Sequence, residues 1–113
     1  MMLIRGCLIF IIFILAPPSF GEEKPGYFLT GNNLNELCQT DRPQVTGYLM
    51  GFSDAYSIKD EMGAKPVVCP PAGVVSTQFA DVVCRYLEEN PEHRHWRAAY
   101  QVHNALIGAW PCQ

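Results

Sequence analysis

An apolar segment near the N-terminus divides the chain into two parts of different chemistry. Residues 7–16 form an unbroken apolar run that follows one basic residue, Arg5, and is ended by Pro17-Pro18. Ser19-Phe20-Gly21 then places small residues at the −3 and −1 positions of a cut before Glu22. These three parts, in this order, are typical of a secretory signal peptide.

The length of the apolar run separates this signal from a membrane anchor. Ten apolar residues are too few for a bilayer core of ~30 Å, which needs about twenty. We therefore predict a signal peptide over residues 1–21 and an exported domain over residues 22–113, with no membrane association after cleavage.

The cysteines and charges of the exported domain limit its chemistry. Four of the five cysteines lie in it, Cys38, Cys69, Cys84 and Cys112, and an even number in an oxidising compartment predicts two disulfides. Spacing alone leaves their pairing open. The domain has seven basic and eleven acidic residues, a net charge of −4, and no basic cluster, which excludes nucleic acid as a partner.

Helical spacing of apolar residues dominates the exported domain. We predict a short helix over residues 32–39 and longer ones over residues 43–60 and 76–89. A third long helix is predicted to begin at Asn90-Pro91-Glu92, because a capping residue, a first-turn proline and a first-turn acid each favour the start of a helix. Its predicted core stripe is Trp96, Ala99, Tyr100, His103, Leu106, Ile107 and Trp110.

One proline- and glycine-rich loop, residues 61–75, contains Cys69 and separates the long helices. Gly47 and Gly51, four residues apart, are expected to let another helix approach closely. The predicted fold is therefore all-α: a small disulfide-stapled bundle of about four helices.

No motif in the sequence predicts catalysis. Ser53 lies in a partial nucleophile-elbow pattern without the final glycine and inside a helical stripe. His93 and His95 are two residues apart and do not share a helix face, so they predict no metal site. His103 is expected to be a hydrogen-bonded core residue, and Cys84 to form a disulfide. We expect no enzyme activity and no cofactor.

The remaining charged and aromatic residues have two interpretations each. The acidic groups are solvated faces or a steering surface for a basic protein partner. Trp96, Tyr100 and Trp110 are interpreted as core residues first and interface anchors second.

Several short motifs together resemble the Rap/Tai immunity proteins of type VI secretion. In chain order these motifs are Phe28-Leu29-Thr30-Gly31-Asn32 with Leu37-Cys38; Gly47-Tyr48, Gly51 and Asp54-Ala55; Cys69-Pro70, Gly73-Val74, Gln78 and Asp81-Val82-Val83; Tyr86-Leu87-Glu88, Asn90-Pro91-Glu92, Arg94-His95, Ala98-Ala99 and Pro111-Cys112. The resemblance implies a periplasmic, all-helical, disulfide-bonded protein, commonly a homodimer, that binds and blocks a peptidoglycan amidase toxin without performing chemistry.

One position departs from the family pattern. The family places a cysteine two residues before the Gly-Tyr pair, where this sequence has Val45, so the usual partner of Cys69 is missing. We expect Cys84 to replace it, which gives Cys38–Cys112 and Cys69–Cys84 as the predicted disulfides.

If the immunity hypothesis holds, the recognition surface is expected in the loop of residues 61–75 and the acidic turn of residues 88–92, because loops on a stapled scaffold present side chains at little ordering cost. The predicted partner-binding residues are Glu61, Lys65, Glu88, Glu89, Glu92 and Arg94. The alternative function is a small periplasmic acid-stress chaperone, a class with a similar build that loses structure at low pH.

Overall fold

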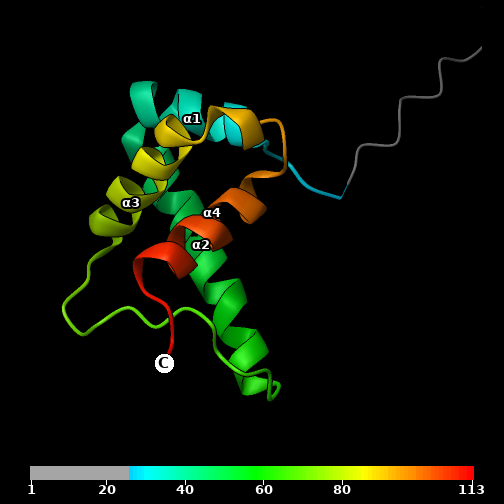
Figure 1. The fold of residues 1–113 in the computed structure, drawn as a ribbon, viewed down its shortest axis with the longest axis vertical. Coiled ribbons are helices and arrows are strands. Elements are labelled where there is room, and N and C mark those ends of the chain that lie inside the picture. The colour runs from blue at the N-terminus through cyan, green and yellow to red at the C-terminus, as the bar shows by residue number, and fades with distance from the viewer. Residues whose placement is uncertain (1–25) are drawn as a thin grey trace, which may run out of the picture.

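The computed structural model describes residues 26–113, and within them the chain forms four α-helices and one short 3-10 helix (Figure 1). The elements are α1 (Gly31–Thr40), α2 (Arg42–Glu61), α3 (Ser76–Glu89), η1 (Pro91–His93) and α4 (Ala98–Ala109). This arrangement confirms the predicted all-α fold. The predicted signal peptide lies outside the described residues, and no helix in the described part is long and apolar enough to cross a membrane.

Local capping explains where the first two helices begin. The Thr30 hydroxyl accepts a hydrogen bond from the backbone N–H of Asn33 at 3.3 Å, and the Asn33 side chain accepts one from the Thr30 N–H at 3.0 Å. This reciprocal pair satisfies two N–H groups at the start of α1. The Asp41 carboxylate accepts from the Gln44 N–H at 3.1 Å, so a single residue, Asp41, separates α1 from α2.

The core lies where α3 packs against the other three helices. In α2 the buried side chains are Val45 and Leu49, both in the first half of that helix. We call α1, residues 42–50, α3 and α4 the core bundle. Its buried apolar residues are Leu34, Val45, Leu49, Ala80, Val83, Cys84, Leu87, Ala98, Val102, Ala105 and Leu106.

The second half of α2 and the loop after it form a protruding arm, residues 51–75. Figure 1 shows this part of α2 extending past α4, and the loop returning across the same end of the molecule to reach α3. No side chain of the arm is fully buried, and Ile58 and Met62 are 54% and 82% exposed. Hydrophobic burial therefore stabilises the arm much less than the core bundle.

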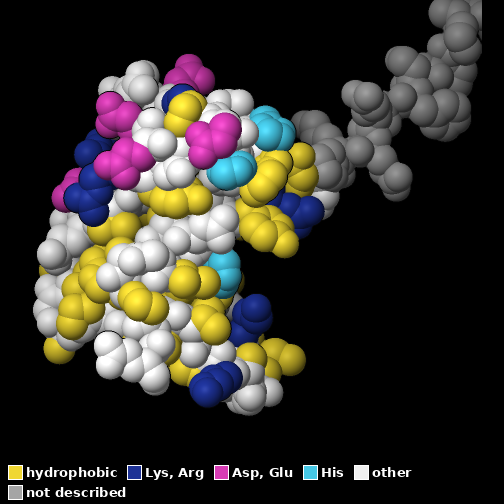
Figure 2. Space-filling model, viewed as in Figure 1, with side chains coloured by type: hydrophobic (Ala, Val, Ile, Leu, Met, Phe, Trp, Pro, Cys, Tyr) yellow, Lys and Arg dark blue, Asp and Glu magenta, His cyan; other side chains and the backbone are white. Residues whose placement is uncertain are grey.

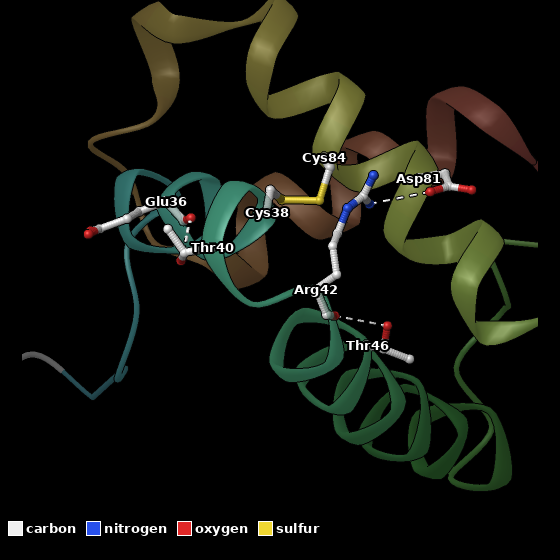
Figure 3. Close-up of a disulfide and its surroundings, with 7 residues drawn as sticks. All are labelled: Glu36, Cys38, Thr40, Arg42, Thr46, Asp81 and Cys84. Carbon is white, nitrogen blue, oxygen red and sulfur yellow. Dashed lines mark hydrogen bonds and ion pairs between the residues drawn. A yellow bond between two sulfur atoms is a disulfide. The ribbon is translucent and has the colours of Figure 1, made fainter.

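Two disulfides join the four cysteines. Cys38 of α1 bonds Cys84 of α3 with a Cα–Cα distance of 5.7 Å, and Figure 3 shows Arg42 reaching Asp81 beside this bond, an ion pair of 3.3 Å. Cys69 in the arm bonds Cys112 at the C-terminus with a Cα–Cα distance of 4.9 Å.

The predicted presence of two disulfides is confirmed, but the predicted pairing, Cys38–Cys112 and Cys69–Cys84, is wrong. Cys84 lies in the middle of α3, on the side packed against α1, and is 8% exposed. Cys69 lies beside the C-terminal segment instead: its N–H donates to the Trp110 carbonyl at 2.8 Å, and the Cys112 N–H donates to the Val67 carbonyl at 3.2 Å. The packing of α3 against α1 therefore selects Cys38 as the partner of Cys84, and the two backbone hydrogen bonds select Cys112 as the partner of Cys69.

The predicted start of the last helix is also wrong. Asn90-Pro91-Glu92 opens only the 3-10 turn η1, and α4 begins at Ala98. The carbonyls of Arg94 and Trp96 accept hydrogen bonds from the N–H groups of Asn32 and Gly31, each at 2.7 Å. Because these carbonyls already accept hydrogen bonds from the first N–H groups of α1, the backbone between η1 and α4 does not continue as a helix.

The buried face of α4 differs from the predicted stripe. The buried residues are Ala98, Gln101, Val102, Ala105 and Leu106, so Leu106 alone is shared with the prediction among fully buried positions. Trp96 and Tyr100 are 46% and 55% exposed, which makes their interpretation as core residues wrong. The small side chains Ala98 and Ala105 allow α4 to pack closely, so the helix is rotated toward them and away from the large aromatic residues.

Close backbone approach occurs at a glycine that the helical spacing did not single out. A Cβ on Gly31 would lie 2.8 Å from the Arg94 carbonyl oxygen, so α1 reaches the η1–α4 connection because this residue is glycine. Gly47 and Gly51, predicted to serve this purpose, have open space at the Cβ position. That prediction is wrong for the described chain.

Candidate partner-binding surface

The predicted partner-binding residues lie at two ends of the molecule. Glu61 and Lys65 are exposed in the arm, whereas Glu88, Glu89 and Glu92 are exposed where α3 ends and η1 begins. Figure 1 places these two regions at opposite ends, and Figure 2 shows acidic side chains gathered at the α3–η1 end. The structure therefore does not bring the predicted residues together into one surface.

Arg94 differs from the other predicted residues because it is half-buried. Its carbonyl holds the Asn32 N–H, and its Nε is buried with no hydrogen-bond partner in the part of the chain described. The backbone of Arg94 therefore holds the start of α1 against the segment that leads into α4.

Exposed aromatic residues gather around the start of α4. The guanidinium of Arg97 lies over the rings of Tyr27 and Tyr100, 5.3 and 5.6 Å from their centroids. The Trp96 ring contacts His93, with centroids 4.6 Å apart. Cations over aromatic faces are held by the quadrupole of the ring, so these contacts orient the Arg97 head while leaving it at the surface.

A second aromatic group lies on α2 and is tied to the first through His103. The Tyr56 hydroxyl and His103 Nδ1 are 2.7 Å apart, a hydrogen bond that links the arm to α4. Burial, followed by the nearby Asp60 carboxylate, raises the pKa of Tyr56 above its ordinary value, so the hydroxyl stays protonated. The Lys59 ammonium lies 5.2 Å from the centroid of the Tyr56 ring.

We call these two groups together the aromatic strip, defined as Tyr56, Lys59, Trp96, Arg97, Tyr100 and His103, and the Tyr56–His103 hydrogen bond joins them. Tyr100 and His103 are three residues apart on α4, as are Tyr56 and Lys59 on α2, so each pair shares a helix face. Figure 2 shows a hollow on this side of the molecule, with hydrophobic and basic side chains on both rims and a histidine between them.

The sequence contained part of the signal for this surface. The spacing of Trp96, Tyr100 and His103 indicates a common stripe, but a stripe of aromatic residues usually belongs to a core. His103 forms the expected hydrogen bond, although the residue is half-buried. Lys59 and Arg97 are not among the predicted residues, although each lies three residues from a ring that it covers, Tyr56 and Tyr100. The other ring under Arg97, that of Tyr27, is distant in sequence.

A smaller hollow of about 150 Å³ lies between the arm and α4. Its walls include Phe52, Val68, Phe79 and Leu106, which are apolar, and also Asp60. The hollow is small for a drug-sized ligand, since ligand pockets usually measure about 300–1,000 Å³.

The residues considered for catalysis lie in structural positions. Ser53 is in the interior of α2, not on a strand-to-helix turn, and Cys84 is consumed in a disulfide. Within residues 26–113, no group of three or more His, Cys, Asp or Glu side chains is placed to hold a metal ion.

The model of a protein family described as Rap1a immunity proteins matches residues 30–112 of this chain. The match begins at the residue that caps α1 and ends at Cys112, so it covers all four α-helices and both disulfides. It confirms the family resemblance indicated by the motifs. No curated protein and no solved structure matches the chain.

Proposed function

The chain belongs to the Rap1a immunity protein family, and we propose that it is a periplasmic immunity protein that binds and blocks a peptidoglycan amidase toxin of a type VI secretion system. The observation that carries this proposal is the family match over residues 30–112, which includes the whole folded domain. The signal-like pattern of residues 1–21 and the two disulfides support an oxidising compartment such as the periplasm.

Inhibition in this proposal depends on occlusion and not on chemistry. A rigid scaffold presents a surface that fits over the catalytic cleft of the toxin, and the affinity comes mainly from slow dissociation. The core bundle suits this role because its helices and the Cys38–Cys84 bond hold the start of α4 and the end of α3 in fixed positions. A pre-organised surface loses little conformational entropy on binding.

We also propose a homodimer, and the outer face of α2 supports it. Gly47 has open space beside it, Met50 is 56% exposed, and both line a shallow apolar groove with Pro43 and Thr77. Met50→Glu places a charge in this groove and should convert the dimer to a monomer in sedimentation experiments. A wild-type protein that sediments as a monomer would contradict the dimer but leave toxin binding intact.

The test of the function is capture of the toxin followed by inhibition. An affinity tag after Gln113, which is exposed, should enrich a cell-wall amidase from the periplasm of the native cells. Adding purified, untagged protein should then abolish hydrolysis of peptidoglycan by that amidase at about one to one stoichiometry. No enrichment, together with no protection of cells that co-express the two proteins, contradicts the proposal.

A matched pair of expression strains tests the location. The full-length chain should protect cells against an amidase directed to the periplasm, whereas a chain lacking residues 2–21 should remain in the cytoplasm and fail to protect. Equal protection by both chains contradicts a periplasmic site of action.

A further inference from the structure

The aromatic strip contains cations without carboxylate partners. Within residues 26–113 the ion pairs are Arg42–Asp81 and His93–Glu92, and neither involves the strip. Arg97 and Lys59 instead lie over tyrosine rings. A cation held over a ring keeps its outward N–H donors available for an incoming carboxylate.

The exposure of the strip distinguishes it from ordinary surface. Trp96 and Tyr100, at 46% and 55% exposed, stand beside Arg97, and Trp, Tyr and Arg are the residue types that dominate binding energy at protein interfaces. Burying such rings in the core is the usual outcome for an amphipathic helix, yet α4 buries Ala98, Gln101, Val102, Ala105 and Leu106 instead. Folding therefore leaves Tyr100 of α4 and Trp96, which precedes α4, at the surface.

The charge distribution selects the chemistry of the occupant. The chain as a whole has a net charge of −3, and its acidic side chains gather at the α3–η1 end, whereas the rims of the hollow carry basic side chains (Figure 2). Glu92 of that acidic end pairs with His93, whose ring contacts Trp96. Asp60 also lies close to the strip, because it acts on Tyr56 and lines the small apolar hollow. A cationic, aromatic strip on an acidic protein attracts an acidic segment and repels a basic one.

We propose that the aromatic strip binds an acidic segment of the toxin, which rests on the proposed function. Carboxylates of that segment pair with Arg97 on α4 and Lys59 on α2, and an apolar or aromatic side chain between them contacts Trp96 and Tyr100. Because the strip crosses from one helix to another, an extended protein segment matches it better than a point-like anion. The acidic residues predicted from the sequence are not the contact surface in this proposal.

A synthetic probe tests the strip independently of the toxin. A random copolymer of glutamate and tyrosine is titrated at low salt into the exported, isotope-labelled protein and followed by NMR. We expect backbone amide shifts at Lys59, Arg97, Tyr100 and His103, and no comparable shifts with a copolymer of lysine and tyrosine. Arg97→Glu should weaken binding of the acidic copolymer about tenfold or more, since it removes one attraction and adds a repulsion.

Arg85→Glu is the matched control. Arg85 is also exposed, lies on α3 away from the strip, and its reversal changes the net charge equally. It should change binding by less than about twofold.

Arg97→Glu is compatible with folding because an acidic side chain at the start of α4 interacts favourably with the helix dipole, and near-UV circular dichroism checks this. Tyr100→Ser is a second variant that removes a ring without changing charge, and we expect it to weaken binding too.

The outcomes separate the proposal from its alternatives. The proposal is overturned if the acidic copolymer does not bind, or if the amide shifts are confined to other regions. Equal losses of copolymer binding for Arg97→Glu and Arg85→Glu also overturn it. A change in the sedimentation of the free protein on Arg97→Glu also overturns it, because the strip is then occupied by a second copy. Once the amidase has been captured, the Arg97→Glu and Tyr100→Ser variants can be tested as its inhibitors. If both inhibit as well as the wild type, the proposal that the strip binds the toxin is overturned, while the immunity function stays in place.

Discussion

The core bundle and the arm are each fastened by a disulfide over a similar interval, 46 residues for Cys38–Cys84 and 43 for Cys69–Cys112. In the core bundle the bond joins two helices that already bury Leu34, Val83 and Leu87 against each other and their neighbours. In the arm the bond joins two segments held otherwise by a few backbone hydrogen bonds and by half-buried side chains. Equal loop length therefore does not imply an equal role for the two bonds.

The largest expected effect comes from removing each bond in turn. Replacing Cys38 and Cys84 by alanine should lower the free energy of unfolding by about 4 kcal/mol, because the unfolded chain gains entropy while packing still fixes the native helices. Replacing Cys69 and Cys112 should cost less, since the arm and the C-terminus then gain freedom in the native state as well.

Denaturant unfolding compares these two variants, and amide hydrogen exchange locates the change. Only the second variant should show faster exchange confined to the arm and the C-terminal segment. Equal losses of stability with no local increase in exchange would mean that the arm is as firmly packed as the core bundle.

Matched aliphatic truncations test the same contrast through burial. Leu34→Ala, at a fully buried position, should cost about 2–5 kcal/mol from lost burial and the cavity it leaves. Ile58→Ala, at a position 54% exposed, should change stability by no more than about 0.5 kcal/mol. Thermal and denaturant unfolding measure both. A cost at Ile58 equal to that at Leu34 would show that another chain covers the arm.

Two glycine substitutions within the core bundle are expected to change stability in opposite directions. Gly31→Ala drives a Cβ to 2.8 Å from the Arg94 carbonyl and should cost about 1–3 kcal/mol. Gly47→Ala has open space and lies inside a helix, where alanine is preferred, so it should stabilise by about 0.5–1 kcal/mol. If Gly47→Ala instead disrupts the dimer, the α2 face packs closely against a second copy.

The smallest expected effect is that of acid. The fully buried polar side chain of the described domain is Gln101, which does not titrate, and Asp81 pairs with Arg42 at an exposed position. Acid unfolding requires protonation of paired carboxylates or charging of buried histidines, so the core bundle should keep its near-UV signal at about pH 3.

This acid experiment separates immunity from the chaperone alternative. An acid-activated chaperone should lose its near-UV signal and bind a hydrophobic dye at the same pH. Retention of the signal in the core bundle, with or without faster exchange in the arm, contradicts the chaperone.

The sequence alone was sufficient for the helices of the middle of the chain, because their signals are local. The bounds predicted for the helices of residues 43–60 and 76–89 differ by at most one residue from α2 and α3. These signals are the apolar spacing, Asp41 and Pro43 at the start of α2, and the proline-rich loop. Each acts within one helix or at its ends. Family motifs distributed over the chain also sufficed for the family match.

The partner-binding residues proposed from sequence and those proposed from structure differ for a physical reason. Exposed acidic turns are visible in a sequence because polarity and turn residues are local properties. The aromatic strip depends on the rotation of α4 and on the approach of Tyr56 to His103, 47 residues away in sequence. Neither the spacing nor the composition of α4 contains that information.

The sequence by itself determined that this chain is an all-α, disulfide-bonded member of its family, because helical periodicity, cysteine number and motif order are properties of the chain. The tertiary structure decided which cysteines pair, where α4 begins and which of its faces is buried. Each of these depends on competition between distant groups: the N–H groups of Gly31 and Asn32 take the carbonyls of Trp96 and Arg94, and small alanines pack where large rings do not fit.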